Sequence, residues 1–289
     1  MLRHLALAAA LLIHAGAAQA QAAEPRDRVG DAFDIRLTIT SESSTDDGSS
    51  SSKSRSGGRM TERVIAVHDT GVELEFDLPA EATDSDRARE WQWPARVLKS
   101  ADGSLQLLNA AELEGRVDAW LTAGEIPREA CGHWIFTWNA FKIECDPQSV
   151  IGALAAFDLR PGDLSDGAPY SEPGGLGPGI LRLESTTSEG STFVAETPVD
   201  AAFVRRQRAD ADLVVADIMG EPKTLEEALQ ARAAEQITGM ITTSLTTDPE
   251  GRVIRRRTVT NMTTAVGGVV ERATATLTAE RRRLETPET

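Results

Sequence analysis

The chain has 289 residues, of which 40% are hydrophobic and 26% charged, enough apolar side chains for a core. It carries 45 acidic and 30 basic residues, a formal net charge of −15 at pH 7. This acidic balance repels phosphate backbones and therefore excludes nucleic acid as an expected partner. The length suits one large domain or two small ones.

The first residues have the pattern of a cleavable export signal. Arg3 adds positive charge, residues 5–13 form an apolar run, and Ala18-Gln19-Ala20 offers small residues for a signal peptidase. The run is shorter than the roughly 20 residues that span a bilayer, and no later segment is long enough, so we expect no transmembrane anchor. We predict that residues 1–20 are removed after Ala20 and that the mature protein is periplasmic or secreted. Its formal charge is 29 − 45 = −16 once Arg3 is lost.

The N-terminal part of the mature chain predicts a β-meander. Apolar side chains at positions 33, 35, 37 and 39 alternate with polar ones, as in a half-buried strand. Residues 41–58 are rich in serine, aspartate and glycine, and we predict a mobile loop there. Residues 59–67 and 72–78 then predict a hairpin around a turn that contains Gly71.

The middle of the chain predicts short elements around a disulfide. Residues 81–90 are charged and irregular or briefly helical, and residues 105–108 favour a short strand. Asn109, with Glu112 as its capping-box partner, starts a predicted helix that ends near Gly124. The β-prone, aromatic segment 131–145 predicts a hairpin that places Cys131 opposite Cys145. Such a disulfide closes a 15-residue loop and stabilises the fold by roughly 3 kcal/mol.

A second helix and a flexible connection follow the cysteines. Asp146 and Pro147 resemble the N-cap and first residue of a helix. Residues 160–179 contain four prolines and six glycines and predict a connection between subdomains.

The remainder of the chain is mostly β. Short strands are predicted at 180–183, 192–197 and 213–219, and Thr224 with Glu227 caps a helix that runs to about residue 236. A final meander is predicted over 237–245, 253–263 and 269–277, with turns at 248–251 and 265–268.

These elements predict an α+β fold: a mostly antiparallel twisted β-sheet with two or three helices packed on one face. An open half-barrel is one form that such a sheet can take. The predicted parts are 21–159, the connection 160–179, and a β-rich part 180–289 that forms one domain with 21–159 in the alternative interpretation. The architecture resembles the open half-barrels of bacterial envelope carriers, although no sequence motif carries that resemblance. The meanders at the two ends are either an internal duplication or the units common to antiparallel sheets.

No motif assigns a reaction, so we name no catalytic residue and expect neither a cofactor nor a metal. Gly-x-Ser-x-Gly and phosphate-loop patterns are absent, and the glycines at 174–177 lie among prolines. Asp46-Asp47 lacks the ligand spacing of a calcium loop. His133 near Cys131 is a conceivable catalytic pair, but we favour a neighbour of the disulfide. His68 lies at a turn, where we expect it to be exposed.

All five tryptophans fall within 48 residues of the chain, at Trp91, Trp93, Trp120, Trp134 and Trp138. They are either a candidate ligand surface for a sugar or apolar molecule, or a local core around the disulfide hairpin, and we favour the core. Three functions compete. First is an envelope module that binds an apolar small molecule or a lipidated partner. The alternatives are a structural or protein-interaction component of the envelope, and a secreted hydrolase.

Overall fold

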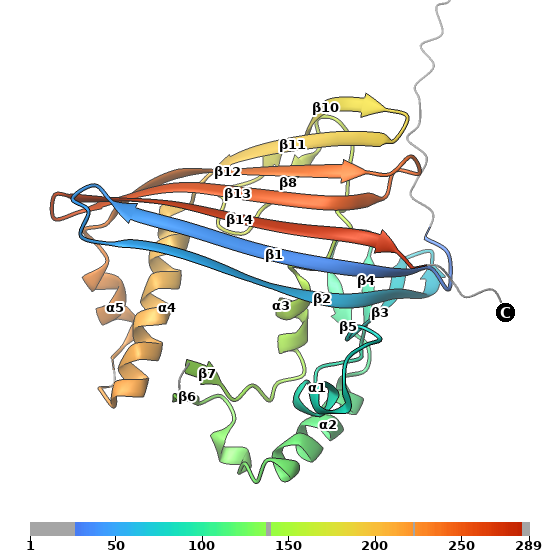
Figure 1. Ribbon diagram of the computed structural model, residues 1–289, viewed down its shortest axis with the longest axis horizontal. Coiled ribbons are helices and arrows are strands. Elements are labelled where there is room, and N and C mark those ends of the chain that lie inside the picture. The colour runs from blue at the N-terminus through green and yellow to red at the C-terminus, as the bar shows by residue number, and fades with distance from the viewer. Residues whose placement is uncertain (1–26, 137–139, 222, 285–289) are drawn as a thin grey trace, which may run out of the picture.

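The computed structural model describes residues 27–136, 140–221 and 223–284, and in these ranges one large antiparallel sheet dominates (Figure 1). Its ten strands lie in the order β10-β11-β12-β13-β14-β1-β2-β3-β4-β5, with β10 and β5 as open edges. The strands are β1 (Ala32–Thr45), β2 (Ser51–His68), β3 (Gly71–Asp77), β4 (Ala95–Ser100), β5 (Leu105–Leu107), β10 (Arg182–Thr187), β11 (Gly190–Pro198), β12 (Gln236–Thr247), β13 (Val253–Val266) and β14 (Val269–Arg283). The sheet is larger than the sequence indicates, but its antiparallel character is as predicted.

The first and last strands of the described chain, β1 and β14, pair in the middle of the sheet. β1 pairs with β14 from Phe33↔Arg283 to Thr45↔Glu271, and on its other side β1 pairs with β2. Strands from residues 32–107 and strands from residues 182–283 therefore form one continuous hydrogen-bonded sheet.

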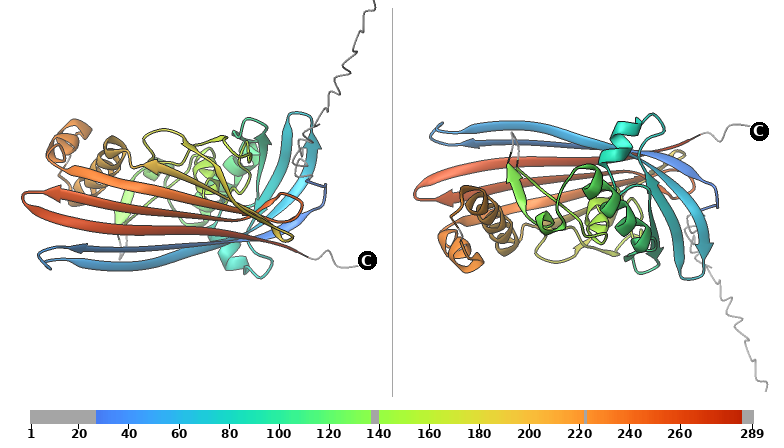
Figure 2. Two further views of the ribbon diagram at one scale, coloured as in Figure 1. Left: turned by 90° about the horizontal axis from the view of Figure 1, so that it is seen from above. Right: turned by 90° about the horizontal axis from the view of Figure 1, so that it is seen from below.

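The two faces of the sheet differ in polarity, as expected of strands with alternating side chains. In β1, Ile35 and Leu37 point to the inner face and are buried, whereas Arg36 is exposed on the outer face. The helices lie on the inner face of the sheet. Seen from above, the sheet lies in front of the helices, and seen from below, the helices lie in front of the sheet (Figure 2).

Five α-helices are present in the described residues, more than the two or three predicted. They are α1 (Asp84–Arg89), α2 (Ala110–Ala123), α3 (Ser149–Leu154), α4 (Ala201–Met219) and α5 (Leu225–Ala231), with a 3-10 turn at Arg128–Ala130. Two small hairpins complete the inner side: β6 (Trp134–Phe136) with β7 (Ala140–Lys142), and β8 (Pro169–Tyr170) with β9 (Gly179–Ile180). α1, α2 and α3 lie below one part of the sheet, and α4 and α5 lie near its opposite end (Figure 1).

The main core forms where α2 and α3 meet the inner face of β1–β5. Leu113, Val117 and Leu121 lie four residues apart in α2, so all three fall on one helix face and all are buried. They belong to one cluster with the sheet residues Leu74 and Phe76. A smaller cluster of Val199, Ile237 and Ile241 packs under α4.

The predicted loop at 41–58 is wrong, because this segment forms the long hairpin of β1 and β2. Serine hydroxyls face each other across the strands, with Ser41 Oγ 2.7 Å from Ser54 Oγ and Ser43 Oγ 3.0 Å from Ser52 Oγ. β14 supplies backbone partners on the other side of β1. The polar composition reflects weak burial of this part of the sheet rather than the absence of pairing.

The predicted strand at 213–219 is also wrong, because these residues form the last turns of α4. Asp200 caps the helix, its carboxylate accepting from the N–H of Ala202 at 2.8 Å, and Gly220 ends it with φ 71°. The apolar run at 213–215 is too short for its periodicity to distinguish a helix from a strand. The caps at Asp200 and Gly220 mark the two ends of a helix.

The predicted helix starts have mixed outcomes. The capping box of Thr224 and Glu227 is confirmed at α5. Asn109 makes no side-chain capping bond at α2, because its Oδ1 instead accepts the backbone N–H of Arg96 at 2.9 Å. α3 begins at Ser149, after Gln148, so Asp146 is not its N-cap.

An ion-pair cluster holds α4 and α5 to each other and to the sheet. Arg232 binds Asp212 of α4 with two hydrogen bonds, of 2.7 and 2.9 Å, and also binds Glu235 at 2.7 Å. Arg208 of α4 reaches Glu235 at 2.9 Å and Thr264 Oγ1 of β13 at 3.1 Å. Because few α4 side chains are fully buried, these contacts carry much of its attachment.

Replacing Leu74 by alanine tests the main core. Leu74 is 0% exposed, so Leu74→Ala leaves a cavity and should lower the free energy of unfolding by about 2–5 kcal/mol. Leu176 is 68% exposed, and Leu176→Ala is the matched control, with an expected change within about 0.5 kcal/mol. Urea unfolding followed by circular dichroism measures both, and equal effects of the two substitutions would contradict the assigned core.

The cluster on α4 also predicts a pH dependence. Hydrogen bonds from Arg232 hold the pKa of Asp212 below its ordinary value of 3.8. A lowered folded-state pKa means that the carboxylate stabilises the fold above its ordinary pKa and loses this contribution as the pH falls through the lowered value. Asp212→Asn should therefore destabilise the protein at neutral pH and lose its effect once the pH has fallen below the lowered pKa of Asp212. Urea unfolding along a series from neutral to acidic pH, with the exposed Asp217→Asn as control, measures this difference, which a pH-independent effect of Asp212→Asn would contradict.

Candidate functional site

Three of the five tryptophans come together around one hollow beside α1 and α2. Trp91, Trp93 and Trp120 line a space of about 440 Å³. Trp134 lies in β6 and is not part of this lining, and Trp138 lies outside the described residues. Trp91 is 4% exposed and belongs to the core, while Trp93 and Trp120 are half-buried at its edge.

Local structure explains why these rings meet. Trp91 and Trp93 precede β4. Trp120 lies on α2, at the boundary between the solvent and the helix face that carries the buried Val117 and Leu121. The rest of the lining includes three alanines of the two helices, Ala88, Ala119 and Ala123, all of them exposed. Because alanine side chains are short, they leave the hollow open beside the indole rings.

Arg87 and Arg116 line this hollow, and hydrogen bonds and ion pairs with neighbouring residues hold both in place. Arg116 donates to the carbonyl of Pro94 at 2.9 Å and pairs with Glu112. Arg87 pairs with Asp77 at 3.1 Å. The hollow therefore combines indole faces with oriented guanidinium groups whose charges are already compensated.

The predicted disulfide is confirmed and removes the cysteine from the proposed catalytic pair. Cys131 and Cys145 are joined with an S–S distance of 2.08 Å and a Cα–Cα distance of 5.6 Å. His133 beside them is exposed, and its backbone N–H donates to Ala130. His68 is also exposed, 3.9 Å from Glu73.

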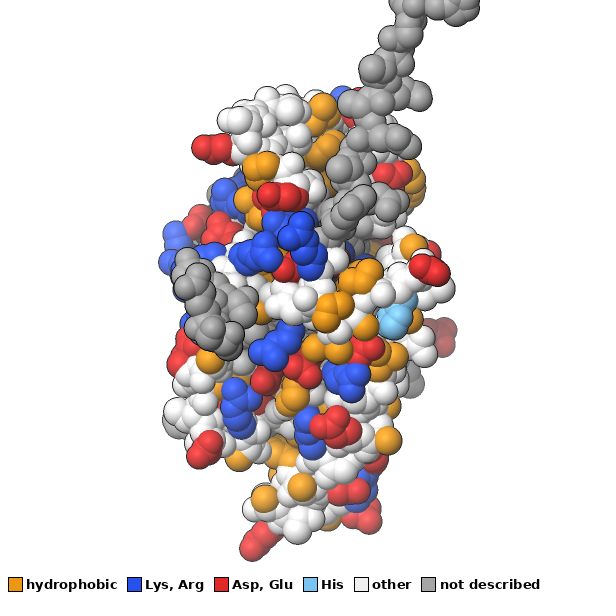
Figure 3. Space-filling view, turned by 90° about the vertical axis from the view of Figure 1, so that its right-hand side faces the viewer, with side chains coloured by type: hydrophobic (Ala, Val, Ile, Leu, Met, Phe, Trp, Pro, Cys, Tyr) orange, Lys and Arg blue, Asp and Glu red, His pale blue; other side chains and the backbone are white. Residues whose placement is uncertain are grey.

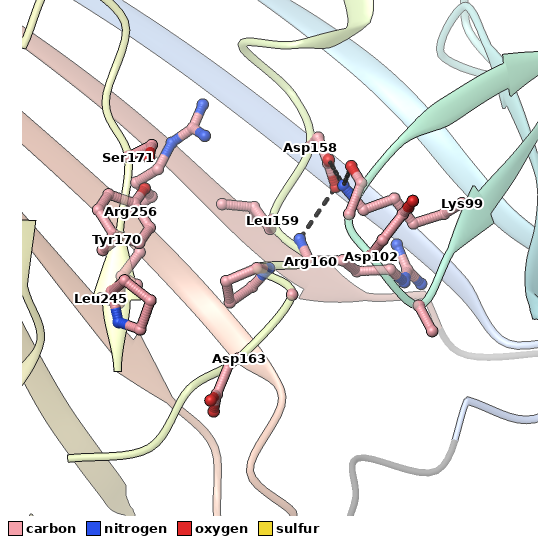
Figure 4. A pocket seen from close by; sticks show the side chains of 15 residues that line it. Lys99, Asp102, Asp158, Leu159, Arg160, Asp163, Tyr170, Ser171, Leu245 and Arg256 are labelled. Carbon is pink, nitrogen blue, oxygen red and sulfur yellow. Dashed lines mark hydrogen bonds and ion pairs between the residues drawn. The ribbon is translucent and has the colours of Figure 1, made fainter. Parts of the chain in front are cut away.

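A second hollow, of about 560 Å³, lies between the β4–β5 turn, residues 158–163 and β8 (Figure 4). Lys99 faces Asp158 there at 2.6 Å and also donates to the carbonyl of Gly103 at 2.6 Å. Arg256 donates to the carbonyls of Ala155 and Ala156 just after α3, at 3.2 and 2.8 Å.

The only tyrosine of the chain is part of this second hollow. Burial and the neighbouring Glu172 raise the pKa of Tyr170 above its ordinary value of 10.0, so its hydroxyl stays protonated. Since Lys99 and Asp158 neutralise each other, the arrangement provides a polar cavity rather than an activated nucleophile.

A buried ion cluster, which the sequence analysis missed, lies at the end of the sheet near Asp27. Glu62 is 0% exposed; it is hydrogen-bonded by Arg160 and lies 2.9 Å from Arg281. Arg160 also binds Asp27 at 3.0 and 3.2 Å, and these carboxylates raise its pKa despite the opposing effect of burial. The alternation of side chains along the strands could have revealed this cluster. Glu62 is two residues from Met60 on β2 and Arg281 is two residues from Ala279 on β14, so both charged side chains lie on the inner face.

No group of three or more histidine, cysteine, aspartate or glutamate side chains that could hold a metal ion occurs in the described residues. In the same part of the chain, no helix is long and apolar enough to cross a membrane.

Comparisons with known proteins do not place the chain in a family. No family model and no curated protein matches it. Among solved structures, Ail, the attachment invasion locus protein of Yersinia pestis, is 5% identical, with 88% of this chain and 100% of that chain covered and a TM-score of 0.20. A conserved protein of unknown function with hot dog fold from Alicyclobacillus acidocaldarius is 10% identical, with 90% and 81% covered and a TM-score of 0.11. At these TM-scores neither similarity carries an argument.

Removing the buried carboxylate of Glu62 tests the ion cluster. Glu62→Gln removes the fully buried carboxylate that Arg160 and Arg281 share and leaves Asp27, 3.0 Å from Arg160 and 3.8 Å from Arg281, as the remaining counter-ion. We expect a loss of about 3–5 kcal/mol in the free energy of unfolding. Glu280, whose side chain is 55% exposed, pairs with Arg255 on the outer face, and Glu280→Gln should cost less than about 1 kcal/mol. Chemical unfolding measures both variants, and a Glu62→Gln protein as stable as the control would overturn the structural role of the cluster.

Proposed function

We propose that this protein is an exported binding module whose ligand is a small molecule with a flat apolar face. The observation that carries the proposal is the hollow of about 440 Å³ lined by Trp91, Trp93 and Trp120. Its size lies within the range of about 300–1,000 Å³ typical of small-molecule sites. Two of its three indoles keep part of their surface in water, which a bound apolar ligand would cover.

The shape of the site supports a flat ligand. Indole rings favour offset-stacked or edge-to-face contacts with other planar groups, and the small side chains of Ala119 and Ala123 leave room for them. Arg116, positioned by the carbonyl of Pro94, can stack on such a ligand as well, because its guanidinium is planar. Its pairing with Glu112 favours a ligand without strong charge.

Export is the second element of the proposal. The disulfide between Cys131 and Cys145 fits a protein that works in an oxidising compartment, the periplasm or the exterior of the cell. The predicted signal at residues 1–20 and the predicted cleavage after Ala20 lie outside the described residues and remain part of the proposal. In that compartment the bound molecule would be an apolar component of the envelope.

Filling the hollow provides the decisive variant. Ala119→Trp places a large ring in the space without removing any core side chain, and Ala111→Trp adds the same ring at another exposed position of α2 that does not line the hollow. Both variants keep all five native tryptophans and the disulfide.

Native mass spectrometry of the mature protein from its own envelope, before and after organic extraction, measures the bound molecule. We expect an extra mass that organic extraction removes on the native protein and on the control Ala111→Trp. The Ala119→Trp protein should lack this extra mass. A bare polypeptide mass in the native protein, or undiminished ligand in Ala119→Trp, would contradict the proposal.

A further inference from the structure

The outer face of the sheet, which the helices leave uncovered, differs in charge from the rest of the protein. Residues directly opposite each other on antiparallel strands point to the same face, so the strand registers assign each charged side chain of β13, β14, β1 and β2 to one face. Nine basic and three acidic side chains of these strands lie on the outer face, a formal charge of 9 − 3 = +6. All other residues of the chain together carry −15 − 6 = −21.

Every carboxylate on the outer face of these four strands is already paired with a basic side chain of the same face. Four of the nine basic side chains take part in these contacts, and a fifth, Arg63, lies opposite Glu75 of β3. The contacts are Arg59 with Asp34, Lys53 with Glu42 at 2.5 Å, Arg255 with Glu280 at 3.3 Å, and Arg282 with Asp34 at 3.8 Å.

The remaining four basic side chains, Arg36, Arg55, Arg257 and Arg272, form what we call the arginine patch. All four are exposed, and none makes an ion pair or a side-chain hydrogen bond within the described part of the chain. They come from four adjacent strands, one each from β1, β2, β13 and β14. The patch is therefore a broad array of uncompensated positive charge.

Threonine side chains separate these arginines on the outer face. Thr40 lies opposite Arg55 on one side and Thr276 on the other, and Thr278 lies opposite Arg257. Their hydroxyls can donate hydrogen bonds to anionic oxygens. Because threonine is short, the arginines remain the longest side chains at these positions.

Charge complementarity identifies the kind of partner that this face fits. Guanidinium groups bind phosphate through parallel N–H donors, and exposed basic groups attract membranes that contain anionic lipids. Small-molecule sites are concave, whereas the arginines of the patch are spread over a sheet face, which matches phosphates that are spread over a surface.

The charge of the rest of the protein orients this approach. The net negative charge outside the outer face is repelled by an anionic surface, so the outer face of the sheet is the side that turns towards it. On the end of the molecule shown in Figure 3, by contrast, acidic and basic side chains are intermixed.

We propose that the arginine patch docks the protein on a membrane surface rich in anionic phospholipid, with the outer face of the sheet against the headgroups. The helices α1 and α2, which border the tryptophan hollow, then lie on the side away from the bilayer (Figure 1). None of the four arginines lines the tryptophan hollow, so either proposal can fail while the other holds.

Co-sedimentation of the mature protein with vesicles tests this proposal. Vesicles of phosphatidylglycerol and phosphatidylcholine in equal parts supply a negative surface, and vesicles of phosphatidylcholine alone supply a bilayer without net charge. We expect binding to the anionic vesicles only. Raising the salt from about 0.05 M to about 1 M should release the protein, because salt screens exposed charges.

Two double variants locate the contact. Arg36→Gln with Arg257→Gln removes two charges of the patch and, at about fivefold per charge, should lower partitioning onto anionic vesicles roughly 25-fold. Arg89→Gln with Arg206→Gln changes the total charge by the same amount on α1 and α4 and should bind as the native protein does. All four side chains are exposed, so we expect both variants to fold, which circular dichroism checks.

The opposing results are equally defined. No binding to anionic vesicles, equal binding to neutral ones, or equal losses in the two double variants would each overturn the proposal. Tighter binding to polyglutamate than to anionic vesicles at the same total charge would also overturn it and assign the patch to an acidic polypeptide. None of these outcomes bears on the mass spectrometry of Ala119→Trp, which tests the tryptophan hollow.

Discussion

The pairing of β1 with β14 is the constraint on which the rest of the molecule depends. It joins segments near the two ends of the described chain, from Phe33↔Arg283 to Thr45↔Glu271, and turns two meanders into one sheet. Such non-local pairing must offset the entropy of closing a long loop. The compensating free energy comes from a continuous inner face on which α2, α3 and α4 bury apolar side chains. The sheet's polar outer face follows from the same alternation.

The same pairing creates the charged end of the molecule. Arg281 on β14 and Glu62 on β2 both face inward, on either side of β1, and Arg160 from the connection after α3 reaches the same carboxylate. Burying these groups is costly unless each finds a partner, which is why the cluster depends on correct strand register. Arg281 Nε and Nη2 are buried and make no hydrogen bond among the described residues, so the charges of Glu62 and Asp27, 2.9 and 3.8 Å from Nη2, hold this member of the cluster.

The sequence was informative where periodicity or a cap acts locally. The strand from Phe33, the hairpin around Gly71, the α2 face of Leu113 and Val117, and the α5 capping box were all predicted and found. It failed at residues 41–58, where β14 supplies hydrogen-bond partners that a local pattern does not reveal, and at 213–219, where a short apolar run fits helix and strand equally. Two of three predicted helix starts lacked the expected side-chain cap, because Asn109 bonds Arg96 instead and α3 starts beyond Asp146.

By itself, the sequence determined the antiparallel β character, the helices α2 and α5 and the pairing of Cys131 with Cys145, because alternation, helical spacing and a short loop between two cysteines are local properties. It also marked the tryptophans as the candidate ligand surface. Only the tertiary structure decided that Trp91, Trp93 and Trp120 share a hollow while Trp134 does not, and that Glu62 meets Arg160 and Arg281. These contacts join segments far apart in the chain, and their geometry is set by strand register and helix docking, which no local pattern encodes.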